Sequence, residues 1–291
     1  MTTPVPTLRD RLRAPAIVEA MAAHSPLSAR LAEEAGFDAL WASGFELSAL
    51  YGVPDLSLLS MTQHLDMVRA MAEQVSLPIV ADIDTGFGNA LNVIHAVERY
   101  EAAGASAVVI EDKVFPKVTS LAPEGRQELV RVAEFQGKVA AAVAGRSRDE
   151  FLIIARTEAL IAGMSAEEAL TRARAYEEAG ADLILVHAKS PTPDALERFA
   201  AAWTGRVGLV FIPTACPALT VARARALGTV RMLIYGNHAI RAAIRGMQDA
   251  FARVRRDGGI QGVGETIAPL EEVFRLQRME VARERERRFL R

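Results

Sequence analysis

The chain repeats one unit, in which an amphipathic helical stretch ends in Ala-Gly or Leu-Gly and a short apolar run follows. The glycines of these dipeptides are Gly36, Gly104, Gly180 and Gly228. Glycine supplies the left-handed residue that ends a helix. A continuous apolar run is typical of a strand that is covered on both faces. The pattern therefore predicts a helix followed by a buried strand at each of these glycines.

Apolar runs of strand length occur at eight places, with helical periodicity between most of them. Alternating strands and helices require a parallel sheet with right-handed crossovers, and eight such units predict a TIM (β/α)8 barrel. An open doubly wound sheet is the alternative, since strand number alone separates the two folds. The expected strands are residues 15–18, 39–41, 77–82, 107–110, 151–155, 183–186, 208–212 and 232–234.

Residues 1–291 are predicted to form a single barrel domain that ends in a helical extension from about residue 260 to residue 291. Core-facing helices explain residues 90–103 and 165–179, the second with Ser165 as its N-cap. An apolar stripe follows the eighth unit and has no strand left to cover, so we expect it to pack on another subunit. The stripe consists of Leu270, Val273, Phe274 and Leu276.

Composition favours a soluble protein that acts on a small molecule. A chain of 291 residues with 51% hydrophobic content can bury one large core. The net charge of -2 leaves no surplus of Lys and Arg for nucleic acid. With only Cys216 no intrachain disulfide forms, which fits a reducing compartment. No secretory signal and no run of ~20 apolar residues for a membrane span are visible, so we expect a cytoplasmic protein.

Polar and charged residues follow the ends of seven of the expected strands. In a (β/α)8 barrel these positions share the C-terminal mouth, where active sites lie. Acids, an Arg, a His and a Ser around one mouth predict a metal-dependent site for an anionic substrate, with Arg156 as a bidentate clamp. The residues are Ser43 and Gly44, Asp82 and Asp84, Glu111 and Asp112, Arg156 and Glu158, His187, Pro213 and Thr214, and Asn237 with His238.

The apolar run at residues 77–82 ends in Asp82 and Asp84, which precede a glycine-rich loop. A buried strand normally excludes acids, and side chains two residues apart point to the same face, so a positive charge should lie between them. Mg2+ suits such a position because it takes one or two carboxylates and keeps several waters. The alternative is an N-cap together with a buried salt bridge to Arg156.

The loop after the fourth strand, residues 113–123, carries Lys113, Lys117, Thr119 and Ser120. Loops at this position of a barrel often close over a ligand and exclude water. The alternative is a solvated loop whose lysines pair with nearby acids. Three histidines to which no chemistry is assigned are His24, His64 and His95.

Six motifs in order along the chain resemble the phosphoenolpyruvate mutase and isocitrate lyase superfamily. The resemblance implies a barrel enzyme for α-oxo acids that depends on Mg2+, with Mn2+ or another divalent ion as a substitute. It also implies a homotetramer or homodimer whose subunits exchange a C-terminal helix. The motifs are Leu27-Ser-Ala-Arg30, Trp41-Ala-Ser-Gly44, Asp82-Ile-Asp-Thr-Gly-Phe-Gly-Asn89, Glu111-Asp-Lys-Val-Phe-Pro-Lys117, Ala155-Arg-Thr-Glu-Ala159 and Glu272-Val-Phe-Arg-Leu-Gln277.

Within the superfamily the chain is most similar to the branch that acts on phosphonopyruvate, and the resemblance implies a role for each matching residue. Asp82 matches the direct Mg2+ ligand, and a further set of acids matches those that hold its waters. One of these acids, Asp55, also resembles a residue proposed as a nucleophile in mutases. The acids that hold waters are Asp55, Asp84 and Glu111; the carboxylate cradle is Ser43 with the backbone of Gly44 and Phe45; the wall against the pyruvyl group is Trp41; the phosphoryl-binding groups are Arg156 and His187.

Two departures from the superfamily pattern select a branch. Carbon–carbon lyases carry a Cys in the loop after the fourth strand, and this chain has none there. Mutases carry an Asn two residues after the loop Lys, whereas here Thr119 follows Lys117, as in phosphonopyruvate hydrolases. The larger amide would shield a reactive phosphoryl group, while the hydroxyl leaves room for a water that Thr119 positions.

The resemblance therefore implies hydrolysis of the P–C bond of 3-phosphonopyruvate to pyruvate and phosphate. Arg156, His187 and Lys117 would offset the charge of the phosphoryl oxygens. The alternatives are a phosphoenolpyruvate mutase, or a lyase for another 2-oxo or carboxylic acid. A non-catalytic barrel that binds carboxylates is a further alternative, although a scaffold has no reason to keep like charges buried together.

Overall fold

The computed structural model describes residues 6–120, 122 and 127–290. Eight parallel strands form a closed barrel in chain order, and β8 pairs back with β1. The predicted TIM barrel is confirmed, and the open doubly wound sheet is excluded. The strands are β1 (Val18–Ala23), β2 (Ala39–Ala42), β3 (Ile79–Asp82), β4 (Ala107–Glu111), β5 (Leu152–Thr157), β6 (Leu183–Val186), β7 (Gly208–Phe211) and β8 (Val230–Tyr235).

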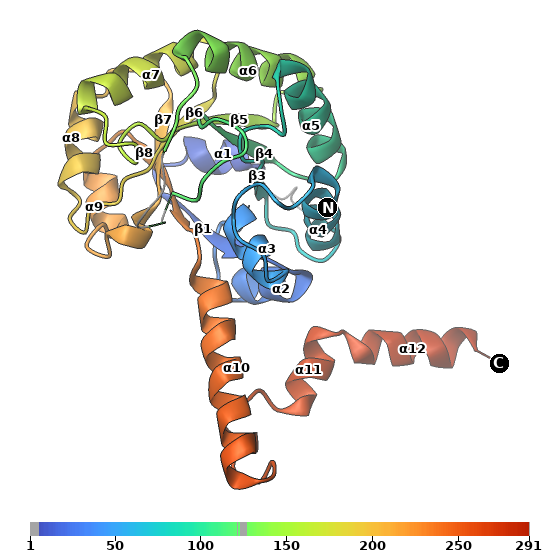
Figure 1. The fold of residues 1–291 in the computed structure, drawn as a ribbon. Helices are drawn as coiled ribbons and strands as arrows, with labels where there is room; N and C mark the ends of the chain where they lie inside the picture. The colour runs from blue at the N-terminus through green and yellow to red at the C-terminus, as the bar shows by residue number, and fades with distance from the viewer. Residues whose placement is uncertain (1–5, 121, 123–126, 291) are drawn as a thin grey trace. The chain divides into compact units, whose positions relative to one another are not determined.

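Helices surround the strands on the outside of the barrel, as Figure 1 shows for α4 to α9. A short helix, α1 (Leu8–Arg13), precedes β1, and Leu8 joins the residues that fill the barrel interior. The others are α2 (Pro26–Glu34), α3 (Gly44–Leu50), α4 (Met61–Ala72), α5 (Ala90–Ala102), α6 (Val132–Gly145), α7 (Ala166–Glu178), α8 (Asp194–Ala202), the 3-10 turn η1 (Pro213–Ala215) and α9 (Val221–Ala226).

The glycines of the repeated unit end helices as predicted. Gly36, Gly104, Gly180 and Gly228 have φ of 85°, 95°, 101° and 73°, values in the left-handed region that glycine adopts without strain. After Gly104, the N–H of Ala105 donates to a carbonyl of the last helical turn, at 3.1 Å, as in a Schellman motif. Each helix therefore ends just before its glycine, and the chain turns there toward the next strand.

Strand residues alternate between two apolar cores, one inside the barrel and one between the strands and the helices. In β5, Leu152 and Ile154 point inward while Ile153 and Ala155 point outward. Such alternation explains why the strands read as continuous apolar runs. The inward position that follows the last interior apolar residue is polar in four neighbouring strands, where it is occupied by Asp82, Glu111, Arg156 and His187.

The first strand was predicted at residues 15–18, and this prediction is wrong, because β1 spans Val18–Ala23. Pro15 is exposed and precedes the strand, in agreement with the absence of a backbone donor in proline. The true strand is rich in alanine and contains Glu19, whose carboxylate accepts a hydrogen bond from Tyr235 at 2.9 Å. Small residues and a charge hid this strand from a search for apolar runs.

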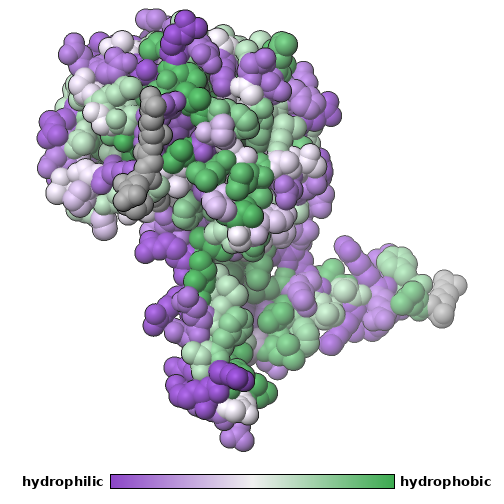
Figure 2. All heavy atoms as spheres, in the orientation of Figure 1, coloured by the Kyte–Doolittle hydropathy of each residue, from purple (hydrophilic) through white to green (hydrophobic). Residues whose placement is uncertain are grey.

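The chain divides into two compact units, with the boundary between His238 and Ala239. The second unit starts before residue 260, where the extension was expected to begin. Its helices are amphipathic, and Figure 2 shows hydrophobic side chains along them. Phe251 and Leu270 are 69% and 61% exposed. The helices are α10 (His238–Asp257), the 3-10 turn η2 (Gly264–Thr266), α11 (Leu270–Leu276) and α12 (Met279–Phe289).

None of the helices described above is both long enough and apolar enough to span a lipid bilayer.

The packing of α6 on α7 gives a test of the outer core. Phe135 is fully buried, and its ring centroid lies 4.5 Å from that of Tyr176. Phe135→Ala should lower the free energy of unfolding by about 3–5 kcal/mol, because it leaves a cavity. Leu91→Ala, at a side chain that is 74% exposed, is the control and should change it by less than about 0.5 kcal/mol. Urea denaturation measures both, and equal effects would contradict the assigned core.

Candidate active site

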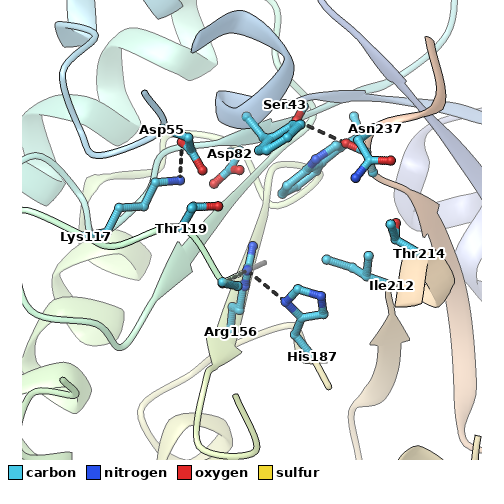
Figure 3. Close-up of a pocket in the computed structure, with 14 residues that line it drawn as sticks. Ser43, Asp55, Asp82, Lys117, Thr119, Arg156, His187, Ile212, Thr214 and Asn237 are labelled. Carbon is cyan, nitrogen blue, oxygen red and sulfur yellow. Dashed lines mark hydrogen bonds and ion pairs between the residues drawn. The ribbon is translucent and has the colours of Figure 1, made fainter. Parts of the chain in front are cut away.

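A cavity opens at the carboxyl ends of the strands and encloses about 470 Å³, its mouth included. In Figure 3, Asp55, Asp82, Lys117 and Thr119 lie on one side of it and Thr214 and Asn237 on the other, with Arg156 and His187 between them. The lining contains the predicted residues Trp41, Ser43, Phe45, Asp55, Asp82, Lys117, Thr119, Ser120, Arg156, His187, Thr214 and Asn237, together with Ile212 and Gly236, which were not predicted.

A smaller pocket adjoins this cavity, and Asp82 lines both. The predicted residues Gly44 and Asp84 line the smaller pocket. A Cβ atom at Gly44 would lie 3.2 Å from Asp84 Oδ1 and 3.5 Å from Asp82 Oδ2. The absence of a side chain at Gly44 therefore lets the start of α3 approach both carboxylates.

Asp82 and Asp84 come together for a different reason from the expected strand alternation. β3 ends at Asp82, and Asp84 lies in the following turn with a left-handed φ of 51°. The backbone N–H of Asp84 donates to Asp82 Oδ1 at 3.3 Å. Lys138 supports the turn from α6, since its Nζ donates to the Thr85 carbonyl at 3.0 Å. The turn, rather than the strand, places the second carboxylate.

Lys117 supplies positive charge to two of the acids. Its Nζ lies 2.9 Å from Asp55 Oδ1 and 2.6 Å from Asp84 Oδ1. Burial opposes the charge of Lys117, but Asp84, Asp55 and Asp82 raise its pKa well above the ordinary value. Burial raises the pKa of Asp84 to about 6, although Lys117 opposes the rise. These pairs confirm that the loop lysines bind nearby acids.

The loop is nevertheless not solvated at its lysines, because Lys113 and Lys117 are 1% and 5% exposed. Lys113 Nζ donates to the Val118 carbonyl and to Ser120 Oγ, both at 2.7 Å. These bonds join the beginning of the segment 113–120 to its end. Part of the predicted loop, residues 121 and 123, lies outside the described residues.

Arg156 does not form the alternative salt bridge with Asp82. Its Nε lies 2.6 Å from Glu158 Oε1 and 3.3 Å from Glu111 Oε2. Burial disfavours the charge of Arg156, but Glu158 and Glu111 raise its pKa. Asp82 forms no ion pair with any described residue. It is therefore the acid of the mouth that still lacks a cationic partner within the described chain.

His187 lines the cavity, and its two ring nitrogens differ in their partners. Its Nδ1 lies 3.2 Å from an Arg156 terminal nitrogen, while its buried Nε2 has no hydrogen-bond partner among the described residues. Burial lowers the pKa of His187, so the ring is neutral at pH 7. Nδ1 faces a donor, Arg156, and an acceptor, Glu158 Oε1, at 3.3 Å, and the shorter contact, to Arg156, favours the tautomer with the proton on Nε2. The predicted role of His187 as an anion-binding group remains a prediction.

Ser43 caps α3, with its hydroxyl accepting from the Glu46 N–H at 3.2 Å and donating to the Gly236 carbonyl at 3.3 Å. The first N–H groups of a helix have no partner within the helix, and those of Gly44 and Phe45 begin α3 beside the cavity. This geometry agrees with the predicted carboxylate cradle, which remains a prediction.

The donor set fits a divalent ion held largely through water. No group of three or more His, Cys, Asp or Glu side chains in the described ranges could hold a metal by itself. However, Glu111 Oε1 is buried without a hydrogen-bond partner in the described chain, and burial raises the pKa of Glu111 to about 7. Mg2+ commonly takes one or two carboxylates and keeps its other waters. Asp82 remains the predicted ligand of such an ion, and Asp55, Asp84 and Glu111 remain the predicted holders of its waters.

Not every polar strand end contributes to the cavity. Asp112 points outward and is bound by Tyr176 Oη at 2.7 Å and Arg172 at 3.3 Å, because it follows the inward-facing Glu111. Conversely, Ile212 and Gly236 line the cavity but carried no chemical signal. Strand parity could have indicated both, since they occupy inward positions of the seventh and eighth units.

The fold and the site together define a (β/α)8 barrel with a cavity lined by charged and polar residues at the carboxyl ends of its strands. The chain belongs to a specific family, because residues 8–255 match the model of the phosphoenolpyruvate phosphomutase family. The resemblance noted in the sequence is thereby confirmed.

Individual relatives are similar over almost the whole chain. Phosphonopyruvate hydrolase of Variovorax sp. (strain Pal2) is 56% identical over 97% of this chain and 98% of the relative. A crystal structure of phosphonopyruvate hydrolase with oxalate and Mg2+ matches with a TM-score of 0.92 and 54% identity, covering 98% of each chain. A phosphoenolpyruvate phosphomutase from Streptomyces platensis subsp. rosaceus matches with a TM-score of 0.95 and 47% identity, again covering 98% of each.

The assignment of Asp82 as the metal ligand can be tested without any assay of turnover. Asp82→Asn keeps the shape but removes the charge, so it should weaken Mn2+ binding by more than the roughly 10- to 100-fold expected for outer-shell partners. The matched control is Asp66→Asn, at a side chain that is 61% exposed on α4. Calorimetric titration with Mn2+ measures both, and wild-type affinity in Asp82→Asn would remove the assignment.

Proposed function

We propose that this chain hydrolyses the P–C bond of 3-phosphonopyruvate to pyruvate and phosphate, with Mg2+ as cofactor. The observation that carries the proposal is the position of Thr119, which lines the cavity together with Lys117 and Arg156. A hydroxyl thus lies among groups suited to a phosphoryl anion. The similarity to phosphonopyruvate hydrolase over nearly the full chain supports the same reaction.

In this reaction the oxygen of a water forms a bond to phosphorus while the P–C bond breaks. The bonding electrons leave with carbon 3 as the enolate of pyruvate, which then takes up a proton. Thr119 positions the water. Arg156, the Nε2 hydrogen of His187 and Lys117 offset charge on the phosphoryl oxygens as the group passes through a loose transition state.

The other end of the substrate is a 2-oxo carboxylate. The start of α3, with Ser43, Gly44 and Phe45, provides backbone donors for the carboxylate and the developing enolate, in the manner of an oxyanion hole. Trp41 is buried and forms a wall of the cavity beside them. When bound through Asp82, Mg2+ supplies Lewis-acid stabilisation of the enolate oxygen. Asp55 is held by Lys117 and keeps that ammonium in place.

The isomerase reaction is the second candidate, because a solved phosphoenolpyruvate phosphomutase has a fold as close to this one as that of the hydrolase. The backbone therefore does not separate the two activities. The side chain at residue 119 separates the two activities. An Asn there would protect the phosphoryl group from water until the enolate oxygen recaptures it, whereas Thr119 leaves room for water.

Phosphorus NMR of the protein with phosphonopyruvate and Mg2+ tests the proposal directly. The resonance of inorganic phosphate should grow at the expense of that of phosphonopyruvate. Accumulation of phosphoenolpyruvate in its place would select the mutase, and no change in either signal would point to a different substrate or to a binding protein.

The role of Thr119 gives a sharper prediction. Thr119→Asn should slow phosphate release by about tenfold to a hundredfold, since displacing a positioned reactant has effects of this size. Thr119→Ser keeps the hydroxyl and is the matched control, with most of the wild-type rate. The same NMR assay measures both, and an unaffected Thr119→Asn enzyme would discard the switch.

We also propose that the enzyme is a homodimer or homotetramer that forms through its C-terminal helices and works in the cytoplasm. Support comes from the apolar side chains that α11 leaves at the surface of the single chain, where Val273 and Phe274 are 38% and 37% exposed. Burying such side chains removes apolar surface from water. Cys216 is buried and free, which suits a reducing compartment.

The assembly is tested by sedimentation. The wild-type protein should sediment as a dimer or tetramer, and Phe274→Asp should shift it toward the monomer because a charge is costly in an apolar interface. Glu271→Gln, on the exposed face of the same helix, is the control and should leave the assembly intact. A monomeric wild-type protein would contradict the proposal.

A further inference from the structure

Glu158 is a carboxylate of the mouth to which no role has been given. It is fully buried and follows β5, two residues after Arg156. It does not line the cavity. Any effect that it has on a bound ligand must therefore act through other side chains.

The two oxygens of Glu158 contact two different parts of the site. Oε1 lies 2.6 Å from Arg156 Nε and 3.3 Å from His187 Nδ1. Oε2 accepts from Ser120 Oγ and lies 3.1 Å from Lys113 Nζ. The first oxygen thus holds Arg156, whose terminal nitrogen bonds His187 in turn, and the second holds the loop of residues 113–120.

The backbone of Glu158 is held as firmly as its side chain. Its N–H donates to Asp112 Oδ1 at 2.8 Å, so the carboxylate cannot retreat from the cluster without breaking a second buried network. A buried carboxylate is tolerated only when it is paired and fully hydrogen-bonded. Glu158 meets that condition through Arg156, Lys113 and Ser120.

Pairing at Nε also decides what the rest of the guanidinium does. One terminal nitrogen of Arg156 lies 3.0 Å from Ser120 Oγ and 3.2 Å from His187 Nδ1. With Nε fixed, the two hydrogens on this nitrogen are donated to Ser120 and His187. The Nε2 hydrogen of His187 then has no partner in the described chain. The orientation of both phosphoryl-binding groups therefore depends on one carboxylate.

We propose that Glu158 is a positioning residue that sets Arg156 and His187 for the phosphoryl end of the substrate and fastens the loop of residues 113–120 to them. The inference rests on the proposed function and names the residue that organises the phosphoryl half of that site. Burial would raise the pKa of Glu158, but Arg156 lowers it well below its ordinary value, so the carboxylate stays charged.

Glu158→Gln tests the proposal, because it preserves the shape and removes the charge. With Mg2+ present, affinity for inorganic phosphate should fall about tenfold to a hundredfold, the effect of losing a charged hydrogen bond. Affinity for oxalate, which has carboxylates and no phosphoryl group, should change by less than about twofold. Calorimetric titration measures both ligands, and neither measurement requires turnover.

The matched control is Glu101→Gln, at a buried carboxylate away from the cavity that binds Arg148 and the Ser147 N–H. It should leave the affinities for both ligands unchanged. A comparable loss of phosphate and oxalate binding in Glu158→Gln would indicate a merely structural role and overturn the inference. Tighter phosphate binding would also overturn it, since the negative charge of Glu158 would then only weaken the attraction of the site for the phosphate anion.

Ser120→Ala provides a second variant in case Glu158→Gln does not fold. It removes the hydroxyl that joins Glu158 to the loop and to Arg156, so phosphate affinity should again fall while oxalate affinity is kept. Unchanged phosphate binding would overturn the inference. If the wild-type protein binds phosphate but does not release it from phosphonopyruvate, the proposed function fails while the positioning role is still tested.

Discussion

The structure depends on one constraint, which is that a cluster of charges buried at the mouth of the barrel must be balanced within a few ångströms. An unpaired charge in a low-dielectric interior costs several kcal/mol. Lys117 forms ion pairs with Asp55 and Asp84, while Arg156 and Lys113 form ion pairs with Glu158. The balance leaves the Asp82 carboxylate without an ion-pair partner in the described chain and the buried Nε2 of His187 without a hydrogen-bond partner there.

The barrel supplies this arrangement through the alternation of its strands. In β3 to β6, inward side chains are apolar along the body of the strand and become polar one inward position later, where the strands end. His187 and Arg156 are neighbours because β5 and β6 are paired. The cations of Lys117 and Arg156 and the start of α3 thus border one cavity.

Much of the fold and the site was predictable, because both rest on local patterns. Helix-ending glycines such as Gly104 and apolar runs such as the one before Asp82 indicated the barrel. β1 escaped detection because alanines and Glu19 replaced its apolar run. Lys117 was recognised as part of the loop, but its pairing with Asp55 and Asp84 joins three segments far apart in the chain, and no local pattern carries that information.

By itself the sequence determined the fold class, the order of the units and the set of chemical groups that gather at the mouth, because period and strand parity are properties of short segments. Only the tertiary structure decided how those groups pair. The turn after β3 places Asp84 beside Asp82. Glu158 joins the loop to Arg156, and through Arg156 to His187. Electrostatic pairing depends on distances between segments that are remote in the chain, and those distances exist only once the barrel has closed.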